Sequence, residues 1–218
     1  MRGFFSLDNP FFSFLSRVAD LMLISVLCLL CCVPVVTVGA AVTAAHKVIF
    51  DIHHQQDSGI IRPFFSAFRE NFGQATAGWI VYLLTLAFLV LDVMLVRANC
   101  VGTLALVLTF VILIVLLLVF ANMCYFFPIL SRYTNTLPRH LYNCFLLSLG
   151  ELPRTLALIV LQLSPLLVYL LSPMLMFQTL LGWILIGFGL VIFLQQWILK
   201  PLFRKLEKTP DSEPSQVK

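Results

Sequence analysis

The sequence predicts an all-α integral membrane protein, a bundle of about five transmembrane helices with an amphipathic interfacial helix before the second span. Hydrophobic residues make up 61% of the 218 residues and charged residues only 11%, whereas soluble domains contain about 45–50% and ~25%. The mean hydropathy is +1.01. Long runs without charge are the third observation, and the three together exclude a soluble globular domain, a disordered protein and a nucleic-acid-binding protein.

Charge-free runs locate the spans, because a bilayer core of ~30 Å needs about 20 apolar residues. The runs are Leu21–Ala45, Asn71–Leu91, Ala98–Ser131 and Thr155–Leu199. As one helix the last run would be about twice as long as the core is thick, so we expect it to fold back at Ser172-Pro173, where proline disfavours a continuing helix. The expected spans are residues 20–42, 74–96, 102–126, 155–172 and 178–199 of a single transmembrane domain, 1–208, followed by a disordered cytoplasmic tail, 209–218.

The first span contains Pro34, Thr37 and Gly39. Pro34 lacks a backbone donor and is expected to kink this span. Small residues then recur four apart, as Gly39/Thr43, Ala40/Ala44 and Ala41/Ala45. Such spacing lets helix backbones approach closely in lipid. Two interpretations are open: a tight crossing within the chain, or a kinked and flexible gate.

Residues 61–75 form the predicted interfacial helix. At 100° per residue, four phenylalanines gather on one face, and a polar face lies opposite. The aromatic face contains Phe64, Phe65, Phe68 and Phe72, and the polar face contains Arg62, Ser66, Arg69 and Glu70. This pattern is typical of a helix in the headgroup plane. It predicts either an anchor that positions the second span or a docking surface for a cytoplasmic partner.

Basic residues set the expected orientation. With five spans, one side carries only Arg2, Arg17 and Arg97, whereas the other carries Lys47, Arg62, Arg69, Arg132, Arg139, Arg154, Lys200, Arg204, Lys205, Lys208 and Lys218. The positive-inside rule places the richer side in the cytoplasm. The N-terminus is therefore expected outside and the C-terminus inside.

Polar residues within the spans are candidates for function or for helix packing. Asp92 is the most deeply set acid, and such acids mark functional sites unless they pair or reach the interface. Arg97, five residues on, is a possible partner. Uncharged side chains are expected to hydrogen-bond between helices; they are Asn122, Gln162, Gln178, Gln195 and Gln196.

Two clusters contain metal-ligand chemistry. Cys28, Cys31 and Cys32 can share one helix face, which suggests a thiol site or, in hydrocarbon, plain packing. Asp51-x-His53-His54-x-x-Asp57 contains an i,i+4 pair, which suggests a metal site or a solvated helix face. We favour the structural reading of both clusters, and we expect no metal, no cofactor and no catalytic residues.

The run Pro34-Val-Val-Thr-Val-Gly39, followed by Phe65-x-x-Phe68-x-x-Asn71-Phe72 and Trp79, resembles the YesL-like family of bacterial membrane proteins of unknown function. The resemblance covers the first 80 residues or so. It implies a multi-pass protein of the bacterial plasma membrane and an association with carbohydrate uptake. The residues that carry it are our candidates for interaction or packing, together with Asp92.

Three function classes follow. The first is a non-enzymatic accessory or regulatory protein that binds a solute-uptake complex or another membrane protein in the lipid bilayer. The second is a small-solute transporter or channel, which requires a continuous polar cavity. The third is a membrane enzyme, for which the sequence offers no nucleophile–base pair and no phosphate-binding glycine loop. We favour the first.

Overall fold

The computed structural model describes residues 10–53 and 59–207, and within these ranges the chain forms helices and no strand. The order is α1 (Pro10–Cys32), a 3-10 turn (Val35–Thr37), α2 (Val38–His53), α3 (Ile61–Asn99), α4 (Thr103–Leu130), α5 (Leu137–Gly150), α6 (Leu152–Gln162), α7 (Ser164–Leu171), α8 (Pro173–Gly182), a π-helical turn (Trp183–Gly187) and α9 (Phe188–Glu207). The expected disordered tail, 209–218, lies outside the described residues.

The all-α multi-helix fold is confirmed. Five helical segments are long and apolar enough to cross a membrane: Phe14–Cys32, Val35–Ile52, Ile61–Asn99, Thr103–Leu130 and Pro173–Leu206. Helices α5 and α6 pass the same test only as a pair, and they are bent by 105°. The count of five matches the sequence, but the segments do not correspond one to one with the expected spans: the first expected span falls on two of them, and the expected span 155–172 falls on none.

The first difference lies at Pro34. The expected span 20–42 is divided between α1 and α2, because the helix ends at Cys32 and resumes at Val38. Pro34 has the extended backbone angles φ −77° and ψ 113°. The effect of this proline is therefore a complete break instead of a kink. The second difference is the expected span 155–172, which is shared by the short helices α6 and α7.

Two expected turns are present. Helices α3 and α4 form a hairpin around residues 100–102, where Gly102 adopts a positive φ of 70°. Helix α7 ends and α8 begins at the expected Ser172-Pro173 step, and the Ser172 hydroxyl accepts a hydrogen bond from the Leu175 amide. A side chain thus caps α8 at the point where proline ends the previous helix.

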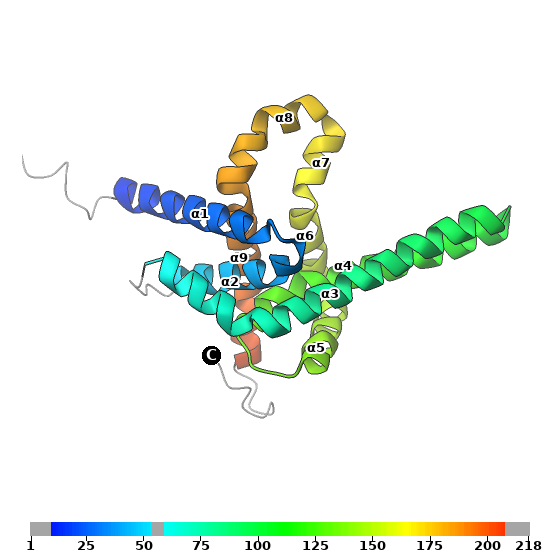
Figure 1. Ribbon diagram of the computed structural model, residues 1–218, viewed down its shortest axis with the longest axis horizontal. Coiled ribbons are helices and arrows are strands. Elements are labelled where there is room, and N and C mark those ends of the chain that lie inside the picture. The colour runs from blue at the N-terminus through cyan, green and yellow to red at the C-terminus, as the bar shows by residue number, and fades with distance from the viewer. Residues whose placement is uncertain (1–9, 54–58, 208–218) are drawn as a thin grey trace, which may run out of the picture.

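The helices meet in a central base from which arms project (Figure 1). In the base, α2, the first part of α3, the end of α4, α5, α6 and α9 pack around Tyr125, Phe126 and Leu199, all fully or almost fully buried. The rest of α3 and α4 extends away as a long hairpin, and α7 with α8 forms a second arm (Figure 1). Each arm therefore has far fewer neighbours within the chain than the base has.

Helices α2 and α3 cross at Gly39. A Cβ atom built on Gly39 would lie 2.4 Å from the Ala75 carbonyl oxygen and 2.7 Å from Trp79 Cβ. Ala40, Ala41, Ala44 and Ala45 are fully buried on the same helix. The small residues of α2 therefore form a tight crossing within the chain, because only short side chains allow this backbone separation.

Replacing Gly39 by alanine is expected to destabilise the protein. The new Cβ would overlap backbone, so α2 and α3 would have to separate, at a cost of about 1–3 kcal/mol for an overpacked site. Thermal unfolding in detergent micelles measures the change. The matched control is Gly73→Ala on α3, where a Cβ meets nothing within 4 Å and helix propensity favours alanine by up to ~1 kcal/mol. Equal midpoints for the two variants would contradict the crossing.

Candidate functional site

The break between α1 and α2 is closed by side-chain hydrogen bonds. Thr37 Oγ1 lies 2.8 Å from the Pro34 carbonyl oxygen and 2.5 Å from that of Cys31. Trp79 of α3 donates its indole N–H to the Val35 carbonyl oxygen at 2.7 Å. A helix end leaves carbonyls without partners, and these donors supply them. The candidate residues Pro34, Thr37 and Gly39 thus lie together against α3.

The aromatic pattern of residues 61–72 belongs to the first turns of α3, which continues without a break into the second apolar run. Asn71 and Phe64 are buried in the base, whereas Phe65 and Phe72 are exposed. Asn71 donates its amide to the Ala67 carbonyl oxygen at 2.9 Å. Phe68 contacts Phe72 with 5.5 Å between ring centroids. The predicted aromatic face is therefore divided between the protein core and the surroundings.

Asp92 lies on the hairpin arm, two turns before α3 ends at Asn99. Its side chain is partly exposed. Within the described residues no ion pair joins it to Arg97, so this expected contact is absent from the structure. Asp92 is thus an acid set in apolar surroundings, away from the base.

The two clusters with metal-ligand chemistry do not form a metal site in the part of the chain that the structure describes. Cys28 is buried and Cys31 and Cys32 are half-buried on α1, all as free thiols. His53 ends α2, and His54 and Asp57 lie outside the described residues. The thiols therefore lie in a packed helix face against α2.

A buried arginine is the main polar feature of the base. Arg132 follows the end of α4 and is 7% exposed. Its guanidinium lies between the rings of Phe50 on α2 and Phe203 on α9, 3.9 and 3.8 Å from their centroids. A cation over an aromatic face is stabilised by the ring quadrupole, and more so when water is excluded. Arg132 therefore joins three segments that are distant in the sequence.

Gln196 of α9 connects this arginine to His46 of α2. Its Oε1 accepts a hydrogen bond from Arg132 Nη2 at 2.5 Å, and its Nε2 lies 3.1 Å from His46 Nδ1 and 3.3 Å from the His46 carbonyl oxygen. An amide N–H₂ group can only donate, so Nδ1 of His46 accepts. The imidazole is then neutral, with its proton on Nε2. We call Arg132, Gln196 and His46 the polar core.

Part of this cluster was visible in the sequence. Gln196, Gln195 and Asn122 do bond between helices: Gln195 donates to the Cys124 carbonyl oxygen at 2.6 Å, and Asn122 donates to that of Leu141 at 3.0 Å. Arg132 and His46 were not expected here, because both lie outside the charge-free runs that locate the spans. The signal that points to Arg132 is its position directly after a long apolar run.

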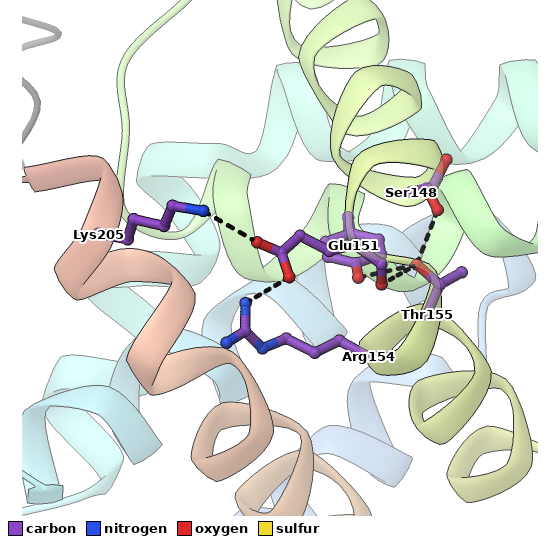
Figure 2. Close-up of polar contacts among 6 residues, drawn as sticks. Ser148, Glu151, Arg154, Thr155 and Lys205 are labelled. Atoms are coloured by element: carbon purple, nitrogen blue, oxygen red, sulfur yellow. Dashed lines mark hydrogen bonds and ion pairs between the residues drawn. The ribbon is translucent and has the colours of Figure 1, made fainter.

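A second polar cluster holds the bend between α5 and α6 (Figure 2). Glu151 lies at the bend and pairs with Arg154 at 2.7 Å and with Lys205 of α9 at 3.6 Å. Thr155 Oγ1 lies 2.8 Å from the Ser148 carbonyl oxygen and 3.0 Å from the Tyr125 hydroxyl. Because Thr155 has one hydroxyl proton and donates it to backbone, Tyr125 is the donor in their contact. We call these residues the elbow cluster.

Both clusters fasten helices to one another. The polar core joins α2, the end of α4 and α9, and the elbow cluster joins α5, α6 and α9. Each cation in them contacts an amide, an aromatic ring or a carboxylate of the same chain. The arrangement is suited to setting helix positions.

The comparisons with known proteins give one result. Residues 18–93 match a family described as "Protein of unknown function, DUF624". YesL-like proteins are in that family, so the resemblance of the first 80 residues is supported at this coarser level. No curated protein and no solved structure matched the chain. The matched range contains α2, the crossing at Gly39 and α3 as far as Asp92 and one residue beyond.

Replacing Gln196 by leucine is expected to lower stability, because Arg132 and His46 each lose a buried hydrogen bond. Leaving such groups without that bond costs about 1–3 kcal/mol. Thermal unfolding in micelles again provides the measurement. Gln178→Leu is the control, since Gln178 is exposed on α8 and makes no hydrogen bond within the described residues. A midpoint for Gln196→Leu at or above that of the control would show that the polar core does not stabilise the fold.

Proposed function

We propose that this chain is a multi-pass protein of the bacterial plasma membrane that acts without catalysis, by binding and regulating another membrane protein. The observation that carries the proposal is Asp92, an acid on an apolar hairpin arm that has few neighbours within the chain. The resemblance to YesL-like proteins adds the nature of the partner, a component of carbohydrate uptake.

The arm has the surface of a helix-packing element. Large apolar side chains are exposed at Leu84, Phe88, Leu91 and Leu95 of α3, and at Leu106, Phe110, Leu113 and Leu117 of α4. Both sets repeat at intervals of four, three and four residues, the spacing with which one helix packs along another. Lipid covers such stripes equally well, so the apolar residues alone do not favour a protein partner.

Asp92 favours a protein partner. It lies one turn after Phe88 and just before Leu95, so it belongs to the same face of α3 as the exposed stripe. A carboxylate at membrane depth is costly, and such groups are found paired or at functional positions. A basic or hydrogen-bond-donating residue on a partner helix would satisfy it. The family match extends to this residue, which is consistent with a role shared within that family.

Crosslinking from the arm tests the proposal. The photoreactive residue p-benzoylphenylalanine, placed at Phe88 in the full chain in bacterial membranes, is expected to give one defined adduct with a subunit of a solute-uptake system. Asp92→Asn should lower the yield at least about tenfold, which corresponds to ~1.4 kcal/mol of interaction. The same crosslinker at Phe177 of α8, also exposed, is the control and should react with lipid.

Three results would contradict the proposal. They are adducts with lipid alone from Phe88, an adduct whose yield does not depend on Asp92, and solute flux through proteoliposomes that contain only this chain. The last result would favour the transporter hypothesis.

The proposed orientation places the C-terminus in the cytoplasm. Tyr133, after α4, contacts Phe203 of α9 with 6.2 Å between ring centroids, and Lys205 pairs with Glu151. The connection after α4 and the basic last turns of α9 therefore meet, as the positive-inside rule requires of a shared cytoplasmic side. The expected outside location of the N-terminus depends on α1 and α2 acting as one span, and two spans would place it in the cytoplasm.

A cysteine-specific or protease-accessible tag after Lys218 should remain protected in intact cells and become reactive when the membrane is permeabilised. A tag before Met1 then distinguishes one N-terminal span, which exposes it, from two, which protect it. Labelling of the C-terminal tag from outside intact cells would overturn the proposed orientation.

A further inference from the structure

Helix α5 has an inverted distribution of side chains. Its inward face contains His140, Cys144 and Ser148, all buried against the base. Its outward face contains large apolar side chains, namely Tyr142, Phe145, Leu146 and Leu149, of which Tyr142 is 63% exposed and Leu146 53%. The outward set has the spacing i, i+3, i+4 and i+7 of one helix face. A helix that points such residues away from the protein is suited to an apolar environment.

The inward face is held by specific contacts. Asn122 of α4 donates to the Leu141 carbonyl oxygen at 3.0 Å, and the His140 ring lies edge-on to that of Phe126, with 6.4 Å between centroids. At the other end, Thr155 bonds the Ser148 carbonyl oxygen. These contacts fix which face of α5 points inward, so the outward position of the apolar residues follows from the fold.

The direction of α5 is set by the bend of 105° between it and α6. Helices α6 and α7 lead along one arm to the turn at Ser172, and α8 and α9 return (Figure 1). If this arm crosses the bilayer, a helix at nearly a right angle to it lies close to the bilayer plane. The elbow cluster holds this angle through Glu151 (Figure 2).

Cations lie at both ends of α5. Arg139 is exposed in the first turn, and Arg154 and the 75%-exposed side chain of Lys205 lie at the elbow. Membrane-surface helices combine an apolar face with basic residues that reach lipid phosphates. The leaflet that faces the basic connections of this protein is also the one expected to carry anionic lipid.

We propose that α5 is a membrane-surface helix, with Tyr142, Phe145, Leu146 and Leu149 in the outer part of the acyl-chain region and Arg139, Arg154 and Lys205 level with the phosphates. Its partner is the lipid bilayer. The sequence assigned this segment to a cytoplasmic loop, residues 127–154, because the arginines at 132, 139 and 154 interrupt the apolar pattern there. The inference is independent of the proposed protein partner, since α5 and the α3–α4 arm are different surfaces.

Tryptophan fluorescence in vesicles tests the proposal. Tyr142→Trp and Phe145→Trp are made in the full chain, reconstituted in phosphatidylcholine–phosphatidylglycerol vesicles with or without bromine on the acyl chains. The emission that each variant adds to that of the three native tryptophans should be lost in brominated lipid and should resist aqueous iodide. Both substitutions exchange one exposed aromatic residue for another, so we expect the fold to be retained.

The matched control is Ser66→Trp, on the exposed polar face of the first turns of α3, whose added emission should be quenched by iodide and not by bromine. Quenching of the α5 tryptophans by iodide alone would show that α5 lies in water. Resistance to both quenchers would show that protein covers this face, through a second copy or another chain. Either result would overturn the proposal.

Discussion

The structure depends on satisfying backbone hydrogen bonds wherever a helix is interrupted in apolar surroundings, where an unpaired N–H or C=O group costs several kcal/mol. Four short interruptions coincide with prolines, at Pro34, Pro153, Pro165 and Pro173. A hydroxyl group bonds backbone at each of them: Thr37 at the first, Thr155 at the second, Ser164 at the third and Ser172 at the fourth. The chain can therefore turn sharply without exposing backbone groups to lipid. The directions of the α7–α8 arm and of α5 follow from the positions of these interruptions.

A second constraint is that lipid provides no hydrophobic force between helices, so close packing and polar contacts must hold them together. The base contains both. Gly39 allows α2 to lie against the backbone of α3. Ser25 Oγ of α1 accepts a hydrogen bond from the backbone N–H of Gly189 in α9 at 2.8 Å. The polar core adds a buried arginine whose charge is met by two aromatic rings and a glutamine. A charged group in such a place is costly unless it is paired and hydrogen-bonded, so the contacts of Arg132 are a condition of its burial.

The sequence predicted the parts of this fold that depend on residues close together in the chain. It predicted the long apolar runs, the turn at Ser172-Pro173 and the hydrogen bonds of Asn122, Gln195 and Gln196. Each of these features depends on a short stretch of sequence in apolar surroundings. Three features were not. Val33-Pro34-Val35 contains no glycine or polar turn residue, so a kink was expected where the helix breaks. Arg132 was counted as a cytoplasmic charge, since burial next to Phe50 and Phe203 depends on residues far away in the chain. Helix α5 was taken for a loop for the same reason, because its apolar face is recognised only when the inward face is known.

The contrast between base and arm explains why the arm is the place to look for a partner. Among the described residues, the side-chain hydrogen bond between α3 and α4 that lies farthest along the hairpin is donated by the Tyr82 hydroxyl to Asn122 Oδ1 at 2.5 Å, and Asn122 itself donates to the Leu141 carbonyl oxygen of α5. Beyond this link, the side-chain hydrogen bonds of Thr85, Asn99 and Thr109 return to carbonyl oxygens of their own helices. Such bonds stabilise each helix and add no contact between the two helices of the hairpin. The direction of the arm is set by α3 and α4, which run unbroken from the base, whereas the packing along its length is left to its surroundings, which are lipid or a partner helix that meets Asp92.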